Sequence, residues 1–119
     1  MNNSTLARIG TIIYAIAVII FGVMHFMHAS VMSGMVPGYF PGGVIWVYLA
    51  GAGLVLAGIA FLINKYSRIA GILLGLMLIL FILVIHLPHH LHGDGTSLAM
   101  ILKDAAMAGA AFVIASRGN

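Results

Sequence analysis

The feature that most limits the possible folds of this chain is a long uninterrupted apolar run. From Ile69 to Ile85 no side chain is charged or strongly polar. A helix rises about 1.5 Å per residue, so a helix over this run and its flanks reaches across the roughly 30 Å hydrocarbon core of a bilayer. We therefore predict that this part of the chain crosses a membrane.

The composition of the whole chain also predicts membrane insertion. Hydrophobic residues make up 63% of the 119 residues and charged residues 6%, whereas soluble domains carry roughly 25% charged residues. No small-x-small cleavage motif follows the first apolar run, which we interpret as a retained span rather than a signal peptide. The predicted fold is all-α, an integral membrane antiparallel four-helix bundle in a single domain. Its helices are expected over about residues 6–30, 44–63, 68–87 and 97–115.

The basic residues predict how such a bundle is oriented. Four of them fall at the termini or in the turn after the second helix, namely Arg8, Lys65, Arg68 and Arg117, and none falls in the loops of the other side. The positive-inside tendency places both termini in the cytoplasm, and we expect a bacterial cytoplasmic (inner) membrane. No cluster of Lys or Arg is present to neutralise phosphates, which argues against nucleic acid as a partner. The absence of cysteine excludes disulfides and thiolate metal sites.

Several local signals predict how the helices begin and pack. Ser4 or Thr5 is the expected cap of the first helix, and Thr96 or Ser97 that of the fourth. Small residues on the second and third helices are expected to allow close helix contacts: Gly51, Gly53, Ala57, Gly58, Gly71 and Gly75. The alanine-rich fourth helix is expected to be buried among the others. The aromatic pair at positions 39 and 40, Tyr39 and Phe40, suits the headgroup level of a membrane.

Polar side chains from three helices are expected to meet near the end of the bundle opposite the termini. The residues predicted to hold a cofactor there are His25, His28, His86, Lys103 and Asp104. Histidines three apart share a helix face, as do His86 and His90 if the third helix continues past Pro88. The neighbouring residues Lys103 and Asp104 point about 100° apart on a helix. Each is therefore expected to contact another helix, with the histidines as candidates, because unpaired charges in a membrane are costly.

The residue types leave several ligands open. Histidine can bind a transition metal, a haem or the carbonyl oxygen of a quinone headgroup. The expected metal ligands are His25, His28, His86 and His90, with copper, iron or zinc as candidates. The nearby methionines, in the segment MHFMHASVMSGM, favour copper, although methionine in a membrane helix commonly only fills space. The structural alternative is that histidines collect where helices leave the membrane and bind nothing, as in an assembly subunit.

Several segments together resemble a known family. They are GVMHFMH, MVPGYFPG, WVYLAGAGLVLAGIAFL, SRIAGILLGLML and LKDAAMAGAAFVIA, in that order, and their order and spacing are similar to those of the DoxX family of small membrane proteins. The resemblance implies a four-helix bundle in the bacterial cytoplasmic membrane and a redox role, as in quinone-reducing subunits. The chain departs from that family in the second span, where Gly51 is followed by Leu54 rather than by a glutamate.

The leading sequence-based hypothesis is therefore an inner-membrane redox-associated subunit with a periplasmic-side His/Lys/Asp pocket for a quinone or redox cofactor. Any enzymatic activity would be that of an oxidoreductase subunit. The expected partners are the lipid bilayer and either further copies of the chain or a redox partner subunit. A His/Met metal-binding membrane protein and a structural subunit without a ligand are the alternatives.

Overall fold

The computed structural model describes residues 2–38 and 41–119. In these residues every regular element is a helix and no strand occurs. The elements are α1 (Asn3–Met27), α2 (Ala29–Met32), η1 (Ser33–Met35), α3 (Gly43–Ile63), α4 (Ser67–Phe81), η2 (Ile82–His86), α5 (Leu87–Leu91) and α6 (Ser97–Arg117). The expectation for Tyr39 and Phe40 lies outside the described residues.

Four helical segments are long and apolar enough to cross a membrane, which confirms the coarse prediction of an all-helical chain with four candidate spans. They are Asn3–Met27, Gly43–Ile63, Ser67–Leu91 and Ser97–Arg117. Bulky aliphatic side chains cover their outward faces; Ile13, for example, is 64% exposed and Leu56 is 66% exposed. Surfaces of this kind suit contact with lipid hydrocarbon rather than with water.

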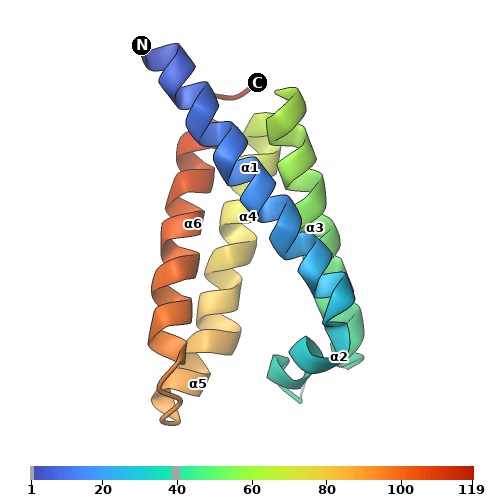
Figure 1. Ribbon diagram of the computed structural model, residues 1–119. Coiled ribbons are helices and arrows are strands. Elements are labelled where there is room, and N and C mark those ends of the chain that lie inside the picture. Colours follow the sequence, from blue (N-terminus) through green and yellow to red (C-terminus); the bar gives the residue numbers. More distant parts are fainter. Residues whose placement is uncertain (1, 39–40) are drawn as a thin grey trace.

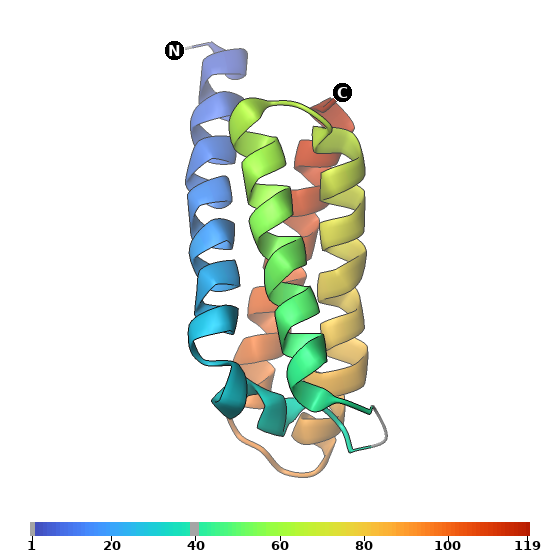
Figure 2. The same ribbon diagram turned by 90° about the vertical axis from the view of Figure 1, so that its right-hand side faces the viewer.

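The four long helices are arranged as two pairs. Helix α1 packs along α3, and α4 packs along α6. Both termini lie at the same end of the molecule (Figures 1 and 2). The two pairs lie close together at that end and diverge toward the opposite end, where α2 and α5 lie (Figure 1).

Glycines account for the close contact within each pair. A Cβ added to Gly51 of α3 would lie 3.0 Å from the carbonyl oxygen of Gly22 in α1, and a Cβ added to Gly71 of α4 would lie 2.6 Å from the carbonyl oxygen of Ala111 in α6. No side chain fits at such distances. The predicted packing role of these small residues is confirmed at Gly51, Gly71 and also Gly58, whose added Cβ would lie 2.9 Å from the carbonyl oxygen of Ala15.

Contacts between the pairs hold the terminal end of the molecule closed. Phe61 of α3 is fully buried there, and the Tyr14 hydroxyl of α1 donates to the Met107 carbonyl of α6 at 2.6 Å. Within the first pair, the guanidinium of Arg8 on α1 donates to the carbonyls of Phe61, at 2.7 Å, and Leu62 on α3. A cation at the last carbonyls of a helix complements both their free lone pairs and the helix dipole. This region, centred on Arg8, Tyr14 and Phe61, is called the closed end below.

One helix start differs from the sequence prediction and one agrees with it. Asn2, rather than Ser4 or Thr5, caps α1, because its side-chain oxygen accepts from the Thr5 N–H at 2.8 Å. Thr96 is the N-cap residue of α6, as predicted, but its side chain makes no capping hydrogen bond. Instead, the carboxylate of Asp94 accepts from the backbone N–H of Thr96 at 3.0 Å and from its hydroxyl at 2.8 Å, which fixes the turn before the helix.

The burial of the fourth helix also differs from the prediction. Only one stripe of α6 is buried, formed by Ser97, Asp104, Ala108, Ala111 and Ala115. The other positions of α6 are exposed or half-buried. A Cβ added to Gly109 would have no atom within 4 Å. Helix α6 is therefore a peripheral helix that packs on α4 along one stripe.

The third span differs most from a regular helix. It runs on past Pro88 to Leu91, beyond the predicted end at about residue 87, but only through a π-helical turn at Ile82–His86. The N–H of Leu87 bonds to the carbonyl of Ile82 there. Since proline has no N–H and its ring crowds the carbonyl of the preceding turn, a widened turn lets the helix continue. The turn leaves His86 only 8% exposed on the inner face.

Candidate functional site

The diverging end of the molecule contains a cavity of about 740 Å³. It lies between the α1/α3 pair and the α4/η2/α6 pair, and residues around η1 line it as well. Six of the eight methionines of the chain contribute to its wall, namely Met24, Met32, Met35, Met77, Met100 and Met107. Phe21, Trp46 and Phe81 add aromatic surface. Most of the wall is therefore apolar, flexible and polarisable.

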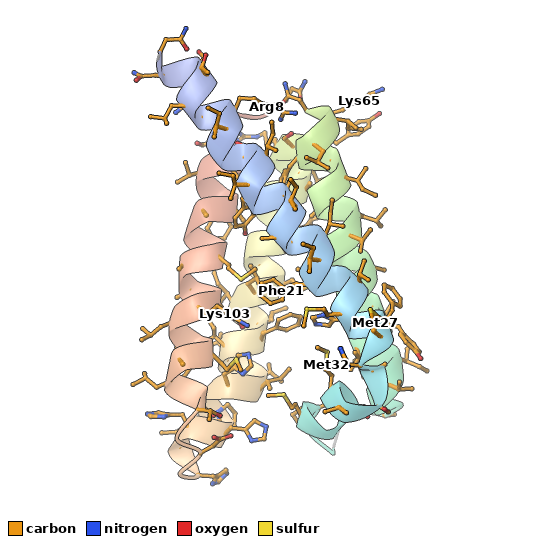
Figure 3. All side chains as sticks on the ribbon, in the orientation of Figure 1. Arg8, Phe21, Met27, Met32, Lys65 and Lys103 are labelled. Carbon is orange, nitrogen blue, oxygen red and sulfur yellow. The ribbon has the colours of Figure 1, made fainter. Side chains whose placement is uncertain are left out.

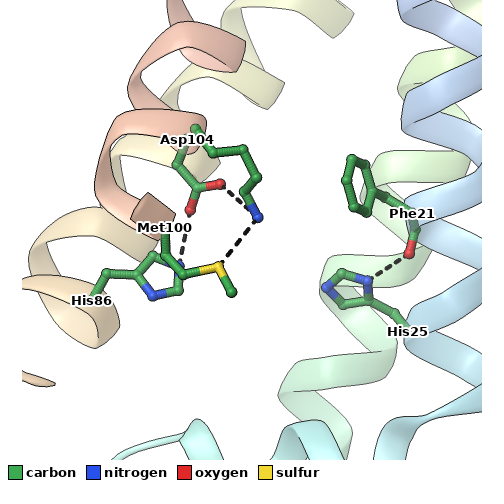
Figure 4. A network of polar contacts seen from close by, with 6 residues as sticks. Phe21, His25, His86, Met100 and Asp104 are labelled. Carbon is green, nitrogen blue, oxygen red and sulfur yellow. Dashed lines mark hydrogen bonds and ion pairs between the residues drawn. The ribbon is translucent and has the colours of Figure 1, made fainter. Parts of the chain in front are cut away.

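One wall of this cavity is polar and comes from η2 and α6. The His86 Nε2 atom lies 3.0 Å from Asp104 Oδ2, and the Lys103 Nζ atom lies 3.4 Å from Asp104 Oδ1 (Figure 4). Asp104 is 3% exposed, so its charge is compensated by these two contacts rather than by water. The predicted contact between Asp104 and a histidine of another helix is present.

The pairing of Lys103 with Asp104 fits the structural alternative, in which these two side chains satisfy each other, rather than the leading hypothesis. We expected adjacent side chains to diverge, but the long lysine stem bends back, so that Nζ reaches its neighbour's carboxylate. The same ammonium lies 3.8 Å from Met100 Sδ and 5.3 Å from the centre of the Phe21 ring on α1. Lys103 therefore extends from α6 toward α1 across the mouth of the cavity (Figure 3).

His25 lines the cavity from the opposite side. Its Nδ1 atom lies 2.7 Å from the carbonyl oxygen of Phe21, one turn earlier on α1. The ring projects from α1 toward α6 (Figure 4). Gly51 allows this placement, because a Cβ added there would lie 2.8 Å from the His25 Cβ.

The other predicted histidines are not part of this arrangement. His28 follows the end of α1 with φ −118°, so the chain has left the helix and the expected shared face with His25 is lost. His90, beyond the π-helical turn, is exposed and does not line the cavity. In the part of the chain that the structure describes, no three His, Asp or Glu side chains gather as a metal site. The expected set of His25, His28, His86 and His90 is thus not brought together.

Sequence reasoning pointed to the methionines of the segment MHFMHASVMSGM but missed those that other helices contribute to the lining, and it missed a second, smaller cavity. Met77 and Met107 pack against the hydrophobic core and also line the large cavity. The second cavity, of about 370 Å³, lies between residues 34–38 and the stretch from Val84 to His92. A long contact of 3.5 Å between His89 Nε2 and the Met35 carbonyl oxygen joins its two sides.

Fold and site together define a small helical protein with four candidate membrane spans and a methionine-lined cavity at one end. The chain belongs to the family described as a domain of unknown function, DUF8561, whose model matches residues 14–113. No curated protein and no solved structure matches the chain.

The family match overturns the resemblance to DoxX. That resemblance was wrong because glycine-rich spans and an aromatic loop follow from membrane packing in general and are shared by unrelated membrane proteins. The redox role that it implied loses that support. A functional proposal must therefore rest on the cavity itself.

Proposed function

We propose that this chain is a multi-pass protein of the bacterial cytoplasmic membrane that binds a lipid-soluble molecule of the quinone class. In this proposal the spans form an antiparallel four-helix bundle, both termini are cytoplasmic and the cavity lies on the periplasmic side. The bound molecule would serve electron transfer, with the chain acting as a binding subunit beside a redox partner subunit.

The orientation is supported by the distribution of charge. Arg8 and Lys65 lie at the same end as the two termini (Figure 3). The loops at the cavity end carry histidines and Asp94 but no Lys or Arg. Short loops rich in Lys and Arg remain in the cytoplasm.

Because the chain has no natural cysteine, the orientation can be tested with two single-cysteine variants. Gly95→Cys should react with a membrane-impermeant maleimide on intact spheroplasts, whereas Ser4→Cys should react only after the membrane is opened. The reverse labelling pattern would contradict the proposed orientation.

The ligand class is supported by one observation above all: the polar wall of an otherwise apolar cavity is already neutral in charge. The ammonium of Lys103 and the carboxylate of Asp104 compensate each other. A further buried anion or cation would be uncompensated and costly. A neutral headgroup can pair with the polar wall through its oxygen atoms, and an apolar tail can pack against the rest of the lining.

The lining favours a flat ring in that headgroup. Thioether sulfurs make favourable contacts with aromatic edges, and aromatic rings stack or meet edge to face. Phe21 of α1, Phe81 of α4 and several methionines line the cavity. Quinones combine a planar ring, carbonyl or hydroxyl oxygens and a long apolar tail, which are the three properties that the cavity selects.

A soft metal ion is the second candidate, supported by one specific observation. Six thioethers and His25 line one cavity, and thioether with imidazole favours copper(I). This candidate predicts stoichiometric copper in protein purified without an affinity tag. A structural subunit without a ligand is the third candidate, and it predicts that nothing binds in the cavity.

The decisive experiment is a binding titration in detergent with a decyl-substituted benzoquinone. Trp46 is the only tryptophan of the chain and lines the cavity, so its emission reports occupation directly. Ala50→Phe should abolish saturable binding, because Ala50 is 9% exposed and faces the cavity. Its matched control, Ala105→Phe on the exposed face of α6, should bind like the unmodified protein.

Several results would contradict the proposal. They are the absence of saturable quenching in the unmodified protein, unchanged binding by Ala50→Phe, and a stoichiometric copper content. A visible haem absorption band in the purified protein would also replace the quinone with another cofactor.

A further inference from the structure

We propose that the cavity prefers the reduced, dihydroxy form of its ligand, a hydroquinone, over the oxidised quinone. The inference rests on the proposed function and adds the oxidation state to it. It concerns binding only, with no electron transfer within this chain.

The first step is the tautomer of His25. A carbonyl oxygen can only accept a hydrogen bond, so the 2.7 Å contact with the Phe21 carbonyl places the ring proton on Nδ1. In the neutral ring, Nε2 then carries a lone pair and no proton. Figure 4 shows this second nitrogen directed away from α1, toward α6. His25 therefore presents an acceptor to the cavity.

The second step is a donor beside it. Lys103 Nζ lies 5.3 Å from the ring centre of Phe21, the residue whose carbonyl fixes His25. An ammonium has three N–H donors and no acceptor. The side chain is 43% exposed and pairs with Asp104 on one side only, at 3.4 Å. The acceptor and the donor thus both lie around Phe21 at the gap between α1 and α6.

The two forms of the ligand differ in how they meet this pair of groups. A phenolic hydroxyl can donate to His25 Nε2, and a phenolic oxygen can also accept from Lys103 Nζ. A quinone carbonyl can accept from Lys103 but has nothing to donate, which leaves the His25 lone pair without a partner. The reduced form therefore gains one hydrogen bond that the oxidised form cannot make.

The polar wall itself holds a second acceptor. His86 Nε2 lies 3.0 Å from Asp104 Oδ2, yet this buried carboxylate oxygen, which can only accept, has no hydrogen-bond partner among the described residues. The other nitrogen of the His86 ring, Nδ1, is also buried and has no hydrogen-bond partner in the described part of the chain. The side chain is 10% exposed. A buried acceptor without a donor is costly, and it biases this wall further toward ligands that bring protons.

The test compares the two oxidation states of one molecule. The unmodified protein is titrated anaerobically with decyl-substituted benzoquinone and with the same compound reduced by dithionite, and Trp46 emission is followed. Half-saturating concentrations are compared rather than amplitudes, because a quinone quenches tryptophan more strongly than a hydroquinone. One additional hydrogen bond should make the reduced form bind about five- to tenfold more tightly.

A variant assigns the preference to His25. His25→Phe keeps the ring shape beside Gly51 but removes the acceptor, so it should lose most of the affinity for the hydroquinone and leave that for the quinone nearly unchanged. The matched control is His28→Phe, three residues later on the exposed side, which should retain the preference.

A third ligand keeps the test decisive if His25→Phe does not fold. The dimethyl ether of the same hydroquinone has ring and oxygens but no donor, and it should bind the unmodified protein no more tightly than the quinone. Equal or tighter binding of the quinone, or of the ether relative to the hydroquinone, would overturn this inference and leave the proposed function standing. Absence of binding by both oxidation states would overturn the proposed function as well.

Discussion

The two ends of this molecule use the same four helices in different ways. At the closed end, Phe61 is fully buried, Tyr14 bonds across to α6, and Arg8 covers the last carbonyls of α3. At the other end, the pairs diverge around a cavity of about 740 Å³. There the gap is crossed by Lys103 of α6, 5.3 Å from the Phe21 ring of α1, and by a long contact from His89 to the Met35 carbonyl, whereas Asp104 pairs within its own half of the molecule.

The difference shows how a chain with few polar groups can be stable and still contain a cavity. Apolar side chains gain little by leaving lipid, so helix association depends on close packing and on hydrogen bonds between helices. Glycine contacts such as Gly58 with Ala15 and Gly71 with Ala111 supply the packing at the closed end, and Gly51 packs on Gly22 beside the cavity. Between the pairs, the open end carries bulkier, flexible methionines and a polar network. The closed end is therefore expected to determine folding, and the open end to determine binding.

The largest expected effect on stability comes from the polar network at the open end. Asp104→Ala removes the partner of two basic groups and should lower the free energy of unfolding by roughly 3 kcal/mol, because a buried histidine loses its carboxylate. The measurement is reversible unfolding in mixed SDS micelles.

The double variant His86→Leu/Asp104→Leu is the control for that prediction. It removes the buried histidine together with its carboxylate and leaves only Lys103, 43% exposed, without its partner, so it should lose clearly less stability than Asp104→Ala, while ligand binding is weakened. If the double variant is as unstable as Asp104→Ala, the ion pair is not the cause.

A glycine substitution tests the packing of the closed end. Gly71→Ala places a Cβ 2.6 Å from the Ala111 carbonyl oxygen and should cost about 2 kcal/mol in the same unfolding assay. Gly109→Ala, with nothing within 4 Å, should be neutral or stabilising by up to about 1 kcal/mol. Equal effects of the two changes would show that α4 and α6 do not depend on this contact.

A smaller effect is expected at the hydrogen bond between the two pairs. Tyr14→Phe removes the donor to the Met107 carbonyl and should cost about 1 kcal/mol. Because this bond lies toward the closed end, affinity for the quinone should not change. A variant that binds poorly while remaining stable would contradict this separation of the two ends.

The smallest effect is expected in the loop before α6. The backbone N–H of Thr96, followed by its hydroxyl, stabilises the ionised carboxylate and lowers the pKa of Asp94 below its ordinary value of 3.8. Because the pKa is lower in the folded state than in the unfolded state, the ionised carboxylate stabilises the fold at pH values above the unfolded-state pKa. This contribution is lost as the pH falls through the folded-state pKa.

Asp94→Asn should therefore lower the melting temperature slightly at neutral pH. The difference from the unmodified protein should shrink at a pH below the pKa of Asp94. A difference that grows on acidification would contradict the assigned hydrogen bonds.

The sequence allowed the four helices, the glycine contacts and the meeting of His86 with Asp104 to be predicted, because each depends on local periodicity or on the cost of a buried charge. The loss of His28 from the site could not be predicted, because the helix ends one residue before it. The resemblance to DoxX failed for a related reason: features common to membrane helices do not identify a family.

The π-helical turn was the least predictable element. In a regular helix the residue seven positions after buried Leu78 is Ile85, rotated by only about 20°, and His86 is rotated by about 80°. The widened turn adds a residue and brings His86 instead to the inner face, where it is 8% exposed. A sequence pattern with a period of 3.6 residues does not indicate where a helix takes up such an extra residue.

That widened turn divides the third span into two helical segments that differ in phase. Before Ile82 and after His86, the lipid-facing positions follow the same spacing but are offset from each other by one residue. Related chains should therefore keep hydrophobic substitutions in one phase up to Ile82 and in a shifted phase beyond it. A relative that lacks a single residue in this stretch would return to one phase without the widened turn, and its equivalent histidine, then seven positions after the equivalent of Leu78, would still face the partner carboxylate.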